Sequence, residues 1–232
     1  MKRGEKLYVG IDPAGKPNRP TGMAVLAGGL RVLALERVHT DEEIESFVAS
    51  WGQAVVSVAL DGPIGLPRGL NPCCFEGESP PSPCPCTQPN GLKGREAERA
   101  MSRKGIGIFY LTKNAFARSW IRRSLDLYGR LTAAGYQVLE VFPYGAKKVL
   151  WRDALPRKQS LWGRERIRTL LEKEGVRFPD ARLPSDHELD ALVGAYVAWL
   201  HARGETEAFG DSVEGAILLP ASDGRSRGLR RR

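Results

Sequence analysis

The chain has 232 residues, of which 42% are hydrophobic and 27% are charged, as in ordinary soluble proteins. This length suits one large α/β domain and is short for two ordinary domains with a linker. No apolar run approaches the roughly 20 residues that span a bilayer, and no signal-like segment follows the start, so we expect a cytoplasmic protein without membrane spans.

The net charge of +8 and the pI near 9.5 favour nucleic acid as a partner, because lysine and arginine attract phosphate backbones. Half of this excess lies in residues 223–232, which contain five arginines and one aspartate. We therefore expect residues 1–222 to form a single domain and residues 223–232 to form a basic, flexible tail. The sequence leaves the oligomeric state open, a dimer included.

The chain is predicted to open with an antiparallel meander of three strands. These strands cover residues 6–11, 21–27 and 30–38. The Gly28-Gly29 pair before the third strand is typical of a hairpin turn. Thr40 and the three acids after it indicate the start of a helix. The apolar run that follows, residues 54–60, is typical of a strand buried on both faces, and a helical crossover into it implies parallel pairing.

A segment rich in Pro, Gly, Ser and Cys follows, and we place an insertion of little regular structure at about residues 62–93. It contains all four cysteines, Cys73, Cys74, Cys84 and Cys86, in the pattern Cys-Cys-x9-Cys-x-Cys. In a cytosolic protein this clustering favours metal or redox chemistry over structural disulfides. The spacing lacks the paired Cys-x2-Cys motifs of common zinc modules, so a Zn²⁺ site and unligated thiols both stay open.

The remainder of the chain predicts alternating helices and strands without an internal repeat, which is typical of an α/β fold. Helices are expected near residues 94–104, 114–134, 144–151, 160–174 and 185–202, and strands at residues 137–142 and 215–219.

Acidic residues end two of the predicted strands. Asp12 follows the first strand, and Asp61 follows the most apolar one. In each case a proline comes next or one residue later, so each acid could be a simple turn residue. Ligands of parallel sheets, however, bind beyond the carboxyl ends of the strands. Both positions are therefore candidates for chemistry.

Two further acids lie where a hydrophobic core is expected. Glu140 is inside a predicted strand, where a carboxylate without a partner costs several kcal/mol, although an edge strand facing water is the alternative. Ser185 and Glu188 form a capping box, which accounts for acids in that first helical turn. Asp190 lies one turn beyond Asp186 on the face that packs inward. Asp, Asp, Glu and Asp together suit one or two Mg²⁺ or Mn²⁺ ions.

Several segments resemble, in order, the motifs of the domain-of-unknown-function 429 family. They are residues 9–15 (Val-Gly-Ile-Asp-Pro-Ala-Gly), 59–67 (Ala-Leu-Asp-Gly-Pro-Ile-Gly-Leu-Pro), 140–143 (Glu-Val-Phe-Pro), 186–191 (Asp-His-Glu-Leu-Asp-Ala) and 214–220 (Glu-Gly-Ala-Ile-Leu-Leu-Pro). The resemblance covers nearly the whole chain. The family is regarded as predicted nucleases with a ribonuclease H-like fold and a site layout related to Holliday-junction resolvases. The Cys-rich insertion departs from the simplest family pattern.

The resemblance implies a five-stranded mixed sheet, three antiparallel strands followed by two parallel ones, flanked by helices. It also implies that Asp12, Asp61 and Asp190 are metal ligands. The resemblance further implies that Asp186 and His187 are accessory members of the site. We expect His187 to shuttle a proton or to orient a ligand, although a helix-start histidine is more often simply solvated or hydrogen-bonded. Glu140 matches the family's Glu-x-x-Pro stretch. The resulting prediction is a metal-dependent nuclease whose catalytic set is Asp12, Asp61, Glu140, Asp186, His187 and Asp190.

Basic residues on the predicted helices are candidates for contacts with phosphates, and neighbouring tryptophans for stacking on bases. They are Arg95, Arg99, Arg118, Arg122 and Arg123 with Trp120, and Arg164, Arg166 and Arg168 with Trp162. Solvated helix faces are the alternative explanation. DNA, RNA and branched substrates all stay open.

Two other functions fit parts of the sequence. The Gly10-Ile11-Asp12-x-x-Gly15 opening is similar to the first phosphate turn of actin-like ATPases and sugar kinases, but no later Gly-rich nucleotide loop follows. The second alternative is a nucleic-acid-binding protein without catalytic activity, which keeps the acids for folding.

Overall fold

The computed structural model describes residues 4–16, 19–77, 79–89, 91–151 and 159–222. The predicted basic tail, residues 223–232, lies outside these ranges. No helix within them is long and apolar enough to cross a membrane.

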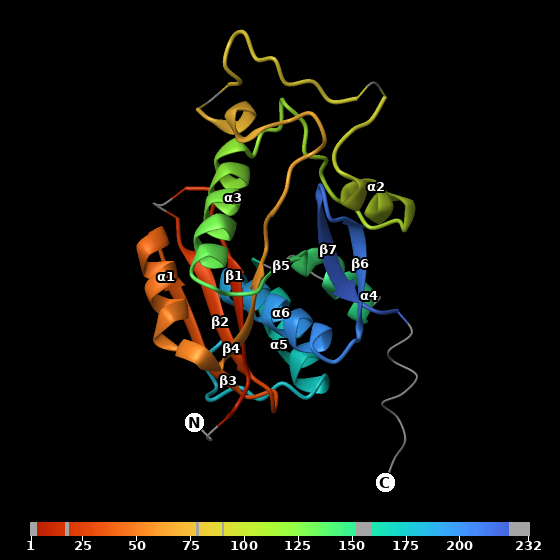
Figure 1. Ribbon diagram of the computed structural model, residues 1–232. Helices are drawn as coiled ribbons and strands as arrows, with labels where there is room; N and C mark the ends of the chain where they lie inside the picture. The colour runs from red at the N-terminus through yellow and green to blue at the C-terminus, as the bar shows by residue number, and fades with distance from the viewer. Residues whose placement is uncertain (1–3, 17–18, 78, 90, 152–158, 223–232) are drawn as a thin grey trace.

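A mixed sheet of seven strands forms the centre of the molecule, in the order β3-β2-β1-β4-β5-β7-β6 (Figure 1). The strands are β1 (Leu7–Asp12), β2 (Thr21–Ala27), β3 (Val32–Val38), β4 (Val55–Leu60), β5 (Val138–Val141), β6 (Thr206–Asp211) and β7 (Gly215–Pro220). The first three pair antiparallel, and β1, β4, β5 and β7 pair parallel. This topology confirms the predicted mixed sheet with three antiparallel strands followed by parallel ones.

The strand count differs from the prediction, which had five strands in the sheet. The hairpin of β6 and β7 extends it to seven. The sequence does not predict β6, because Thr-Glu-Ala-Phe-Gly-Asp has no alternating apolar pattern. Only Phe209 of this strand is fully buried. It is a strand because β7 pairs with it along its whole length, so tertiary pairing overrides local preference.

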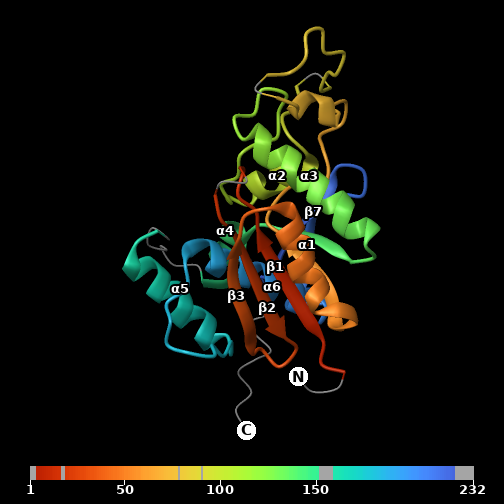
Figure 2. The ribbon, with the colours of Figure 1, turned by 90° about the vertical axis from the view of Figure 1, so that its left-hand side faces the viewer.

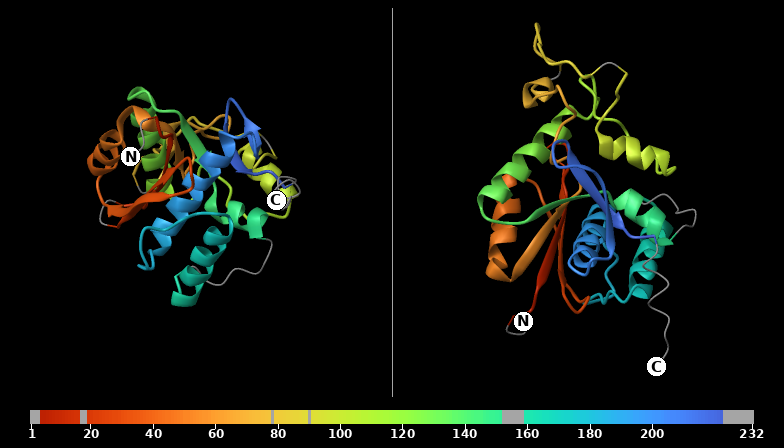
Figure 3. Two further views of the ribbon diagram at one scale, coloured as in Figure 1. Left: turned by 90° about the horizontal axis from the view of Figure 1, so that it is seen from below. Right: turned by 45° about the vertical axis from the view of Figure 1, so that its right-hand side comes forward.

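Helices cover both faces of the sheet (Figures 1 and 3). On one face lie α1 (Asp41–Ser50) and α3 (Arg118–Ala133), and on the other α4 (Pro143–Trp151), α5 (Leu161–Lys173) and α6 (Asp186–His201). Figure 2 shows α5 as the outermost of these. A short helix, α2 (Glu96–Arg103), packs beside β6, and the 3-10 turn η1 (Gly52–Ala54) leads into β4.

Alternation along β1 divides the core into two layers. Leu7, Val9 and Ile11 pack toward α1 and α3, whereas Tyr8 packs toward α6. At Gly10 the α6 backbone approaches so closely that a Cβ would lie 1.8 Å from the Ala191 carbonyl oxygen. These contacts fix α6 directly on the sheet, so that its N-terminus lies at the carboxyl end of β1.

The predicted insertion forms a lobe beyond the carboxyl ends of β1 and β4, at the top of Figure 1. Its described residues contain one regular element, the 3-10 turn η2 (Pro72–Phe75). The lobe has a small core of its own, shared with the segment that leads into α3: Leu70, Cys74, Phe75, Cys86, Leu111, Ala115 and Ile121. We call residues 62–93 the Cys lobe.

Candidate functional site

Asp12 and Asp61 lie side by side at the carboxyl ends of two parallel strands. In the register of β1 and β4, Ile11 is opposite Leu60, and the Asp61 N–H donates to the Ile11 carbonyl oxygen at 2.9 Å. Since Ile11 and Leu60 face α1 and α3, the next residue on each strand faces α6. Two carboxylates therefore face the start of α6, where the sequence predicted a site.

The start of α6 brings Asp186 and His187 to the same end of the sheet. Ser185 caps the helix: its hydroxyl accepts the Glu188 N–H, and the Glu188 carboxylate accepts the Ser185 N–H. His187 Nδ1 lies 2.6 Å from Asp12 Oδ2. Because an ionised carboxylate can only accept, Nδ1 carries the proton, and this bond fixes the ring. Asp186 is partly buried and has no hydrogen-bond or ion-pair partner for its carboxylate among the described residues.

Glu188 belongs to the helix cap and not to the site. Its carboxylate accepts two hydrogen bonds from Arg182, at 3.0 and 3.2 Å. Burial alone would raise the pKa of Glu188, but the hydrogen bonds from Arg182 and Ser185 outweigh burial and lower it. The resulting charged cap holds the first turn of α6, and with it the neighbouring His187, against the sheet.

Asp190 is buried one turn further along α6 and is paired with a lysine. Lys147 Nζ, on α4, lies 2.5 Å from Asp190 Oδ1, and both side chains are 4% exposed. The next turn of the same face, at Gly194, lies over Ala59 and Val141, so Asp190 lies nearer the strand ends. The sequence analysis missed Lys147. The sequence feature that could have identified it is a single charged residue on the buried face of a short helix, between Pro143 and Leu150.

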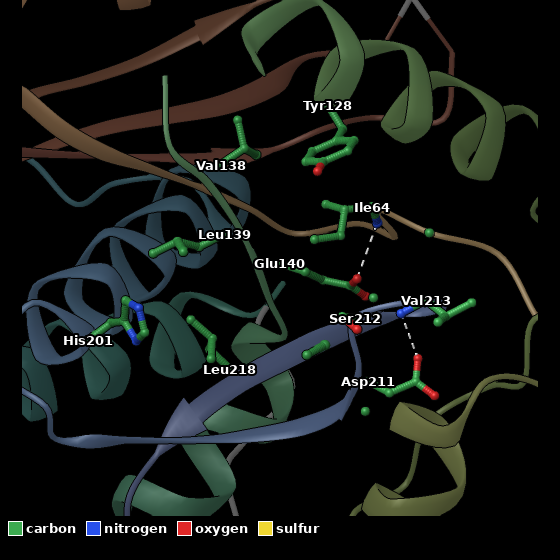
Figure 4. Close-up of a pocket in the computed structure, with 14 residues that line it drawn as sticks. Ile64, Tyr128, Val138, Leu139, Glu140, His201, Asp211, Ser212, Val213 and Leu218 are labelled. Carbon is green, nitrogen blue, oxygen red and sulfur yellow. Dashed lines mark hydrogen bonds between the residues drawn. The ribbon is translucent and has the colours of Figure 1, made fainter. Parts of the chain in front are cut away.

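Glu140 lies on the opposite face of the sheet from Asp12 and Asp61. It pairs with Leu60, and alternation turns it away from Val141, which faces α6. Arg95 binds both Glu140 oxygens, at 2.6 and 2.8 Å, and the Ile64 N–H donates to the same carboxylate (Figure 4). Glu140 therefore belongs to a buried ion-pair network and also lines a cavity that Asp61 lines, and its place in the catalytic set stays a prediction.

The same network includes Glu98, whose carboxylate accepts from the Arg95 Nε at 2.7 Å and from the Leu111 N–H at 3.0 Å. Burial raises the pKa of Glu98 despite the neighbouring guanidinium. Burial alone would lower the pKa of Arg95, but the two carboxylates outweigh burial and raise it. One fully buried arginine thus ties β5 to the start of α2, and breaking such a network by removing one partner is costly.

Residues 10–215 match the family described as "Protein of unknown function (DUF429)". The chain belongs to this family. The match confirms the resemblance that the motifs carried. No curated protein matches the sequence.

Two solved structures are similar to this DUF429 chain at low identity. One, "T. thermophilus RuvC in complex with Holliday junction substrate", is 18% identical, with a TM-score of 0.43, and the match covers 86% of this chain and 96% of that chain. The other, "Thermus thermophilus RuvC structure", is 17% identical, with a TM-score of 0.42 and coverages of 85% and 96%.

The acids of this DUF429 protein suit a hard cation by their chemistry. Asp12, Asp61 and Asp186 offer carboxylate oxygens, which Mg²⁺ and Mn²⁺ prefer, and His187 already orients one of them. Among the described residues, however, the four cysteines are the group whose ligand atoms all lie within 4.8 Å of one another. The carboxylates therefore lie at one end of the sheet, but their oxygens are farther apart than the ligands of a single metal ion.

A cavity of about 240 Å³ opens beside Asp61, and the sequence analysis did not anticipate it. Its walls are mostly apolar and come from separate segments: Pro63, Phe109, Trp120 and Phe142 are among the lining residues. Aromatic side chains beside a carboxylate can stack on a base or pack against a sugar. The cavity therefore gives the candidate site a second surface with different chemistry.

Most arginines proposed for phosphate contact have structural roles in this protein. Arg95 is fully buried against two carboxylates, which leaves it no surface for the predicted phosphate contact. Arg118 and Arg123 are also largely buried, but both line a groove beside Lys16. Arg118 donates to the carbonyl oxygens of Glu76 and Gly77, and Arg123 pairs with Asp41. Arg99 and Arg122 are partly exposed but ion-paired, and Arg168 pairs with Glu172. Trp162 is 65% exposed, whereas Trp120 lines the cavity beside Asp61.

The four cysteines of the Cys lobe come together in space. The Sγ atoms of Cys73 and Cys86 are 3.7 Å apart, as are those of Cys74 and Cys84. Hydrogen bonds from Cys74 and its neighbours lower the pKa of Cys86 to about 7, whereas burial raises the pKa of Cys74 to about 12. The four thiols are therefore gathered at one place in the lobe, although Cys73 and Cys74 are ten or more residues from Cys84 and Cys86 in the chain.

Proposed function

We propose that this protein is a metal-dependent nuclease that hydrolyses phosphodiester bonds of nucleic acid, with Asp12, Asp61 and Asp186 as metal ligands. One observation carries the proposal: acids from β1, from the end of β4 and from the start of α6, far apart in the chain, all lie at the carboxyl end of a parallel pair of strands. Ligands of such sheets bind at this edge.

Each side chain has a distinct task in this proposal. A bound Mg²⁺ or Mn²⁺ would lower the pKa of its water and neutralise the leaving oxygen. His187 holds the Asp12 carboxylate in one orientation through Nδ1. Asp186, in the first turn of α6, lies where backbone N–H groups and the helix dipole favour anions such as a phosphate. Asp190, which pairs with Lys147 one turn further along α6, is the fourth predicted ligand to test.

The surroundings of the acids favour a nucleic-acid substrate. The apolar cavity beside Asp61 offers Phe109 and Trp120 to a base or a sugar. A separate groove of about 700 Å³ is lined by Lys16, Arg118, Arg122 and Arg123, with acids among its other lining residues. The net charge of +8 adds a general attraction for phosphates.

The test is cleavage of end-labelled substrates in Mg²⁺ and in Mn²⁺. The panel contains a four-way DNA junction, duplex DNA, single-stranded RNA and an RNA–DNA hybrid, with ATP hydrolysis measured in parallel. We expect Asp61→Asn and Asp186→Asn each to reduce cleavage at least about 100-fold, because each removes a ligand charge at constant volume. Glu172→Gln, an exposed acid on α5, is the matched control and should cleave like the natural protein.

Cleavage that is equal in all three variants would remove the site from the chemistry. Hydrolysis of ATP without cleavage of any nucleic acid would replace the proposal by the nucleotide-phosphate alternative. Binding without hydrolysis in either metal would favour a nucleic-acid-binding protein without catalytic activity.

A further inference from the structure

We propose that Cys73, Cys74, Cys84 and Cys86 bind one structural Zn²⁺ ion that holds the Cys lobe together. This site uses no residue of the proposed nuclease centre and does not depend on that function. The four Sγ atoms all lie within 4.8 Å of one another, and the Cys73–Cys86 and Cys74–Cys84 pairs are each 3.7 Å apart.

These separations are those of ligands around a single ion. A tetrahedron with Zn–S bonds of about 2.3 Å has S–S edges of about 3.8 Å, close to the spacing between the paired thiols. A disulfide would require about 2.05 Å between two sulfurs and would not gather the second pair. An iron–sulfur cluster places several metal and sulfide atoms between its thiolates, for which sulfurs this close leave no room.

The atoms around the sulfurs also suit a zinc–thiolate centre. The Asn71 side-chain N–H donates to Cys86 Sγ at 3.4 Å, which is the kind of contact that orients a metal ligand. Four thiolates on one Zn²⁺ leave a charge of −2. The Lys113 ammonium donates to the carbonyl oxygens of Cys84 and Cys86, at 3.1 and 3.0 Å, and so places a positive charge beside two of the ligands.

The Cys lobe has little else to stabilise it. Among its described residues only η2 is regular, and two of the seven buried residues in its core cluster are Cys74 and Cys86 themselves. A small unit with so few apolar side chains commonly needs a metal or disulfides to stay folded. A zinc ion bound by Cys73 and Cys74 on one side of the Pro-rich stretch and by Cys84 and Cys86 on the other would supply that link.

The ion would also fix one wall of the cavity beside Asp61. Leu111 belongs both to the core of the Cys lobe and to the cavity lining, and Phe109 packs against that core. Arg118, at the start of α3, donates to carbonyl oxygens of the lobe and lies 5.8 Å from the Phe75 ring. Loss of zinc should therefore loosen the lobe and the cavity wall while leaving the sheet intact.

The direct test is the metal content of the full chain, purified in reducing buffer without added metal. We expect one zinc per chain in the natural protein and in Asp61→Asn, which alters only the carboxylate site. Cys74→Ser and Cys84→Ser should each lose the zinc. Substitution with Co²⁺ should give the intense visible absorption and the sulfur-to-metal charge-transfer band of a tetrahedral thiolate site.

A second measurement covers the case in which the serine variants fail to fold. A mercurial added to the natural protein should release one zinc, detected by a chromogenic chelator, as four thiols are consumed. Limited proteolysis should then cut the Cys lobe and spare the sheet. Four reactive thiols with no bound zinc, even after incubation with Zn²⁺, would overturn the proposal. A mass four hydrogens lower, indicating two disulfides in the native protein, would overturn it as well.

Discussion

Single charged residues inside this protein each have a partner from another element. Arg95 forms ion pairs with both Glu98 and Glu140, and Lys147 forms one with Asp190. An isolated carboxylate inside the protein would destabilise the fold or would take up a proton. These buried acids can therefore stay charged because a basic side chain lies beside each of them. The two networks lie in different places: Arg95 and Glu140 line the cavity beside Asp61, whereas Asp190 lies one turn beyond Asp186 on α6.

Replacing Lys147 tests how much the ion pair contributes. We expect Lys147→Met to lower the free energy of unfolding by about 3–5 kcal/mol, because the methionine fills the space but removes the positive charge beside the buried Asp190 carboxylate. Urea denaturation measures the change. The double variant Lys147→Met with Asp190→Leu should recover most of the loss, since no buried charge remains. A single variant as stable as the natural protein would mean that Asp190 is held by other groups.

At the scale of whole elements, α6 determines where the site forms. Two glycines on neighbouring strands let its backbone lie directly on the sheet: a Cβ at Gly10 would lie 1.8 Å from the Ala191 carbonyl oxygen, and one at Gly22 would lie 2.2 Å from that of His187. The second contact is at the helix start, beside the Asp12–His187 hydrogen bond. The spacing between α6 and the sheet therefore fixes the spacing between the acids.

A methyl group on β1 should disrupt this packing. We expect Gly10→Ala to lower the free energy of unfolding by about 3 kcal/mol or more, because the contact is with helix backbone that cannot rotate away. Gly129→Ala, in α3, is the matched control: no atom lies within 4 Å of its added Cβ, and alanine favours the helix by about 1 kcal/mol. Thermal unfolding should separate the two variants in opposite directions. Equal melting temperatures would contradict the close approach of α6.

At the scale of the whole molecule, the positive charge is unevenly distributed along the chain. The net charge is +8, and residues 223–232 contribute +4 of it. Within the described residues, most of the arginines that we considered for phosphate contact are buried or paired with acids. The sequence-independent attraction for nucleic acid should therefore depend strongly on the C-terminal residues.

Deletion of residues 223–232 tests this distribution. Each phosphate neutralised on duplex DNA contributes about 0.9 to the slope of log K against log salt, so we expect the deletion to reduce that slope by about 4. Fluorescence anisotropy over a salt series measures it. A chain in which the five arginines of the tail are lysines keeps the charge and should keep the slope. An unchanged slope after deletion would place the phosphate contacts in the folded part of the chain.

The sequence by itself determined most elements and three positions of the candidate site. Strand and helix patterns are local, so the breaks after Asp12 and Asp61 and the cap before Asp186 could be located without coordinates. Family motifs in the same segments agreed with these positions. The number of strands was not determined in this way, because β6 has no strand pattern apart from its partner β7.

Only the tertiary structure decided which charges meet. A strand buried on both faces has no polar side to set its phase, so the sequence could not tell that Glu140 points away from Asp12. Nothing local connects Lys147 with Asp190, or Cys73 with Cys86. The periodicity of apolar residues predicts whether a residue lies in a helix or a strand and whether it is buried. It does not predict which distant residue a buried group contacts, because that contact forms only when the chain folds.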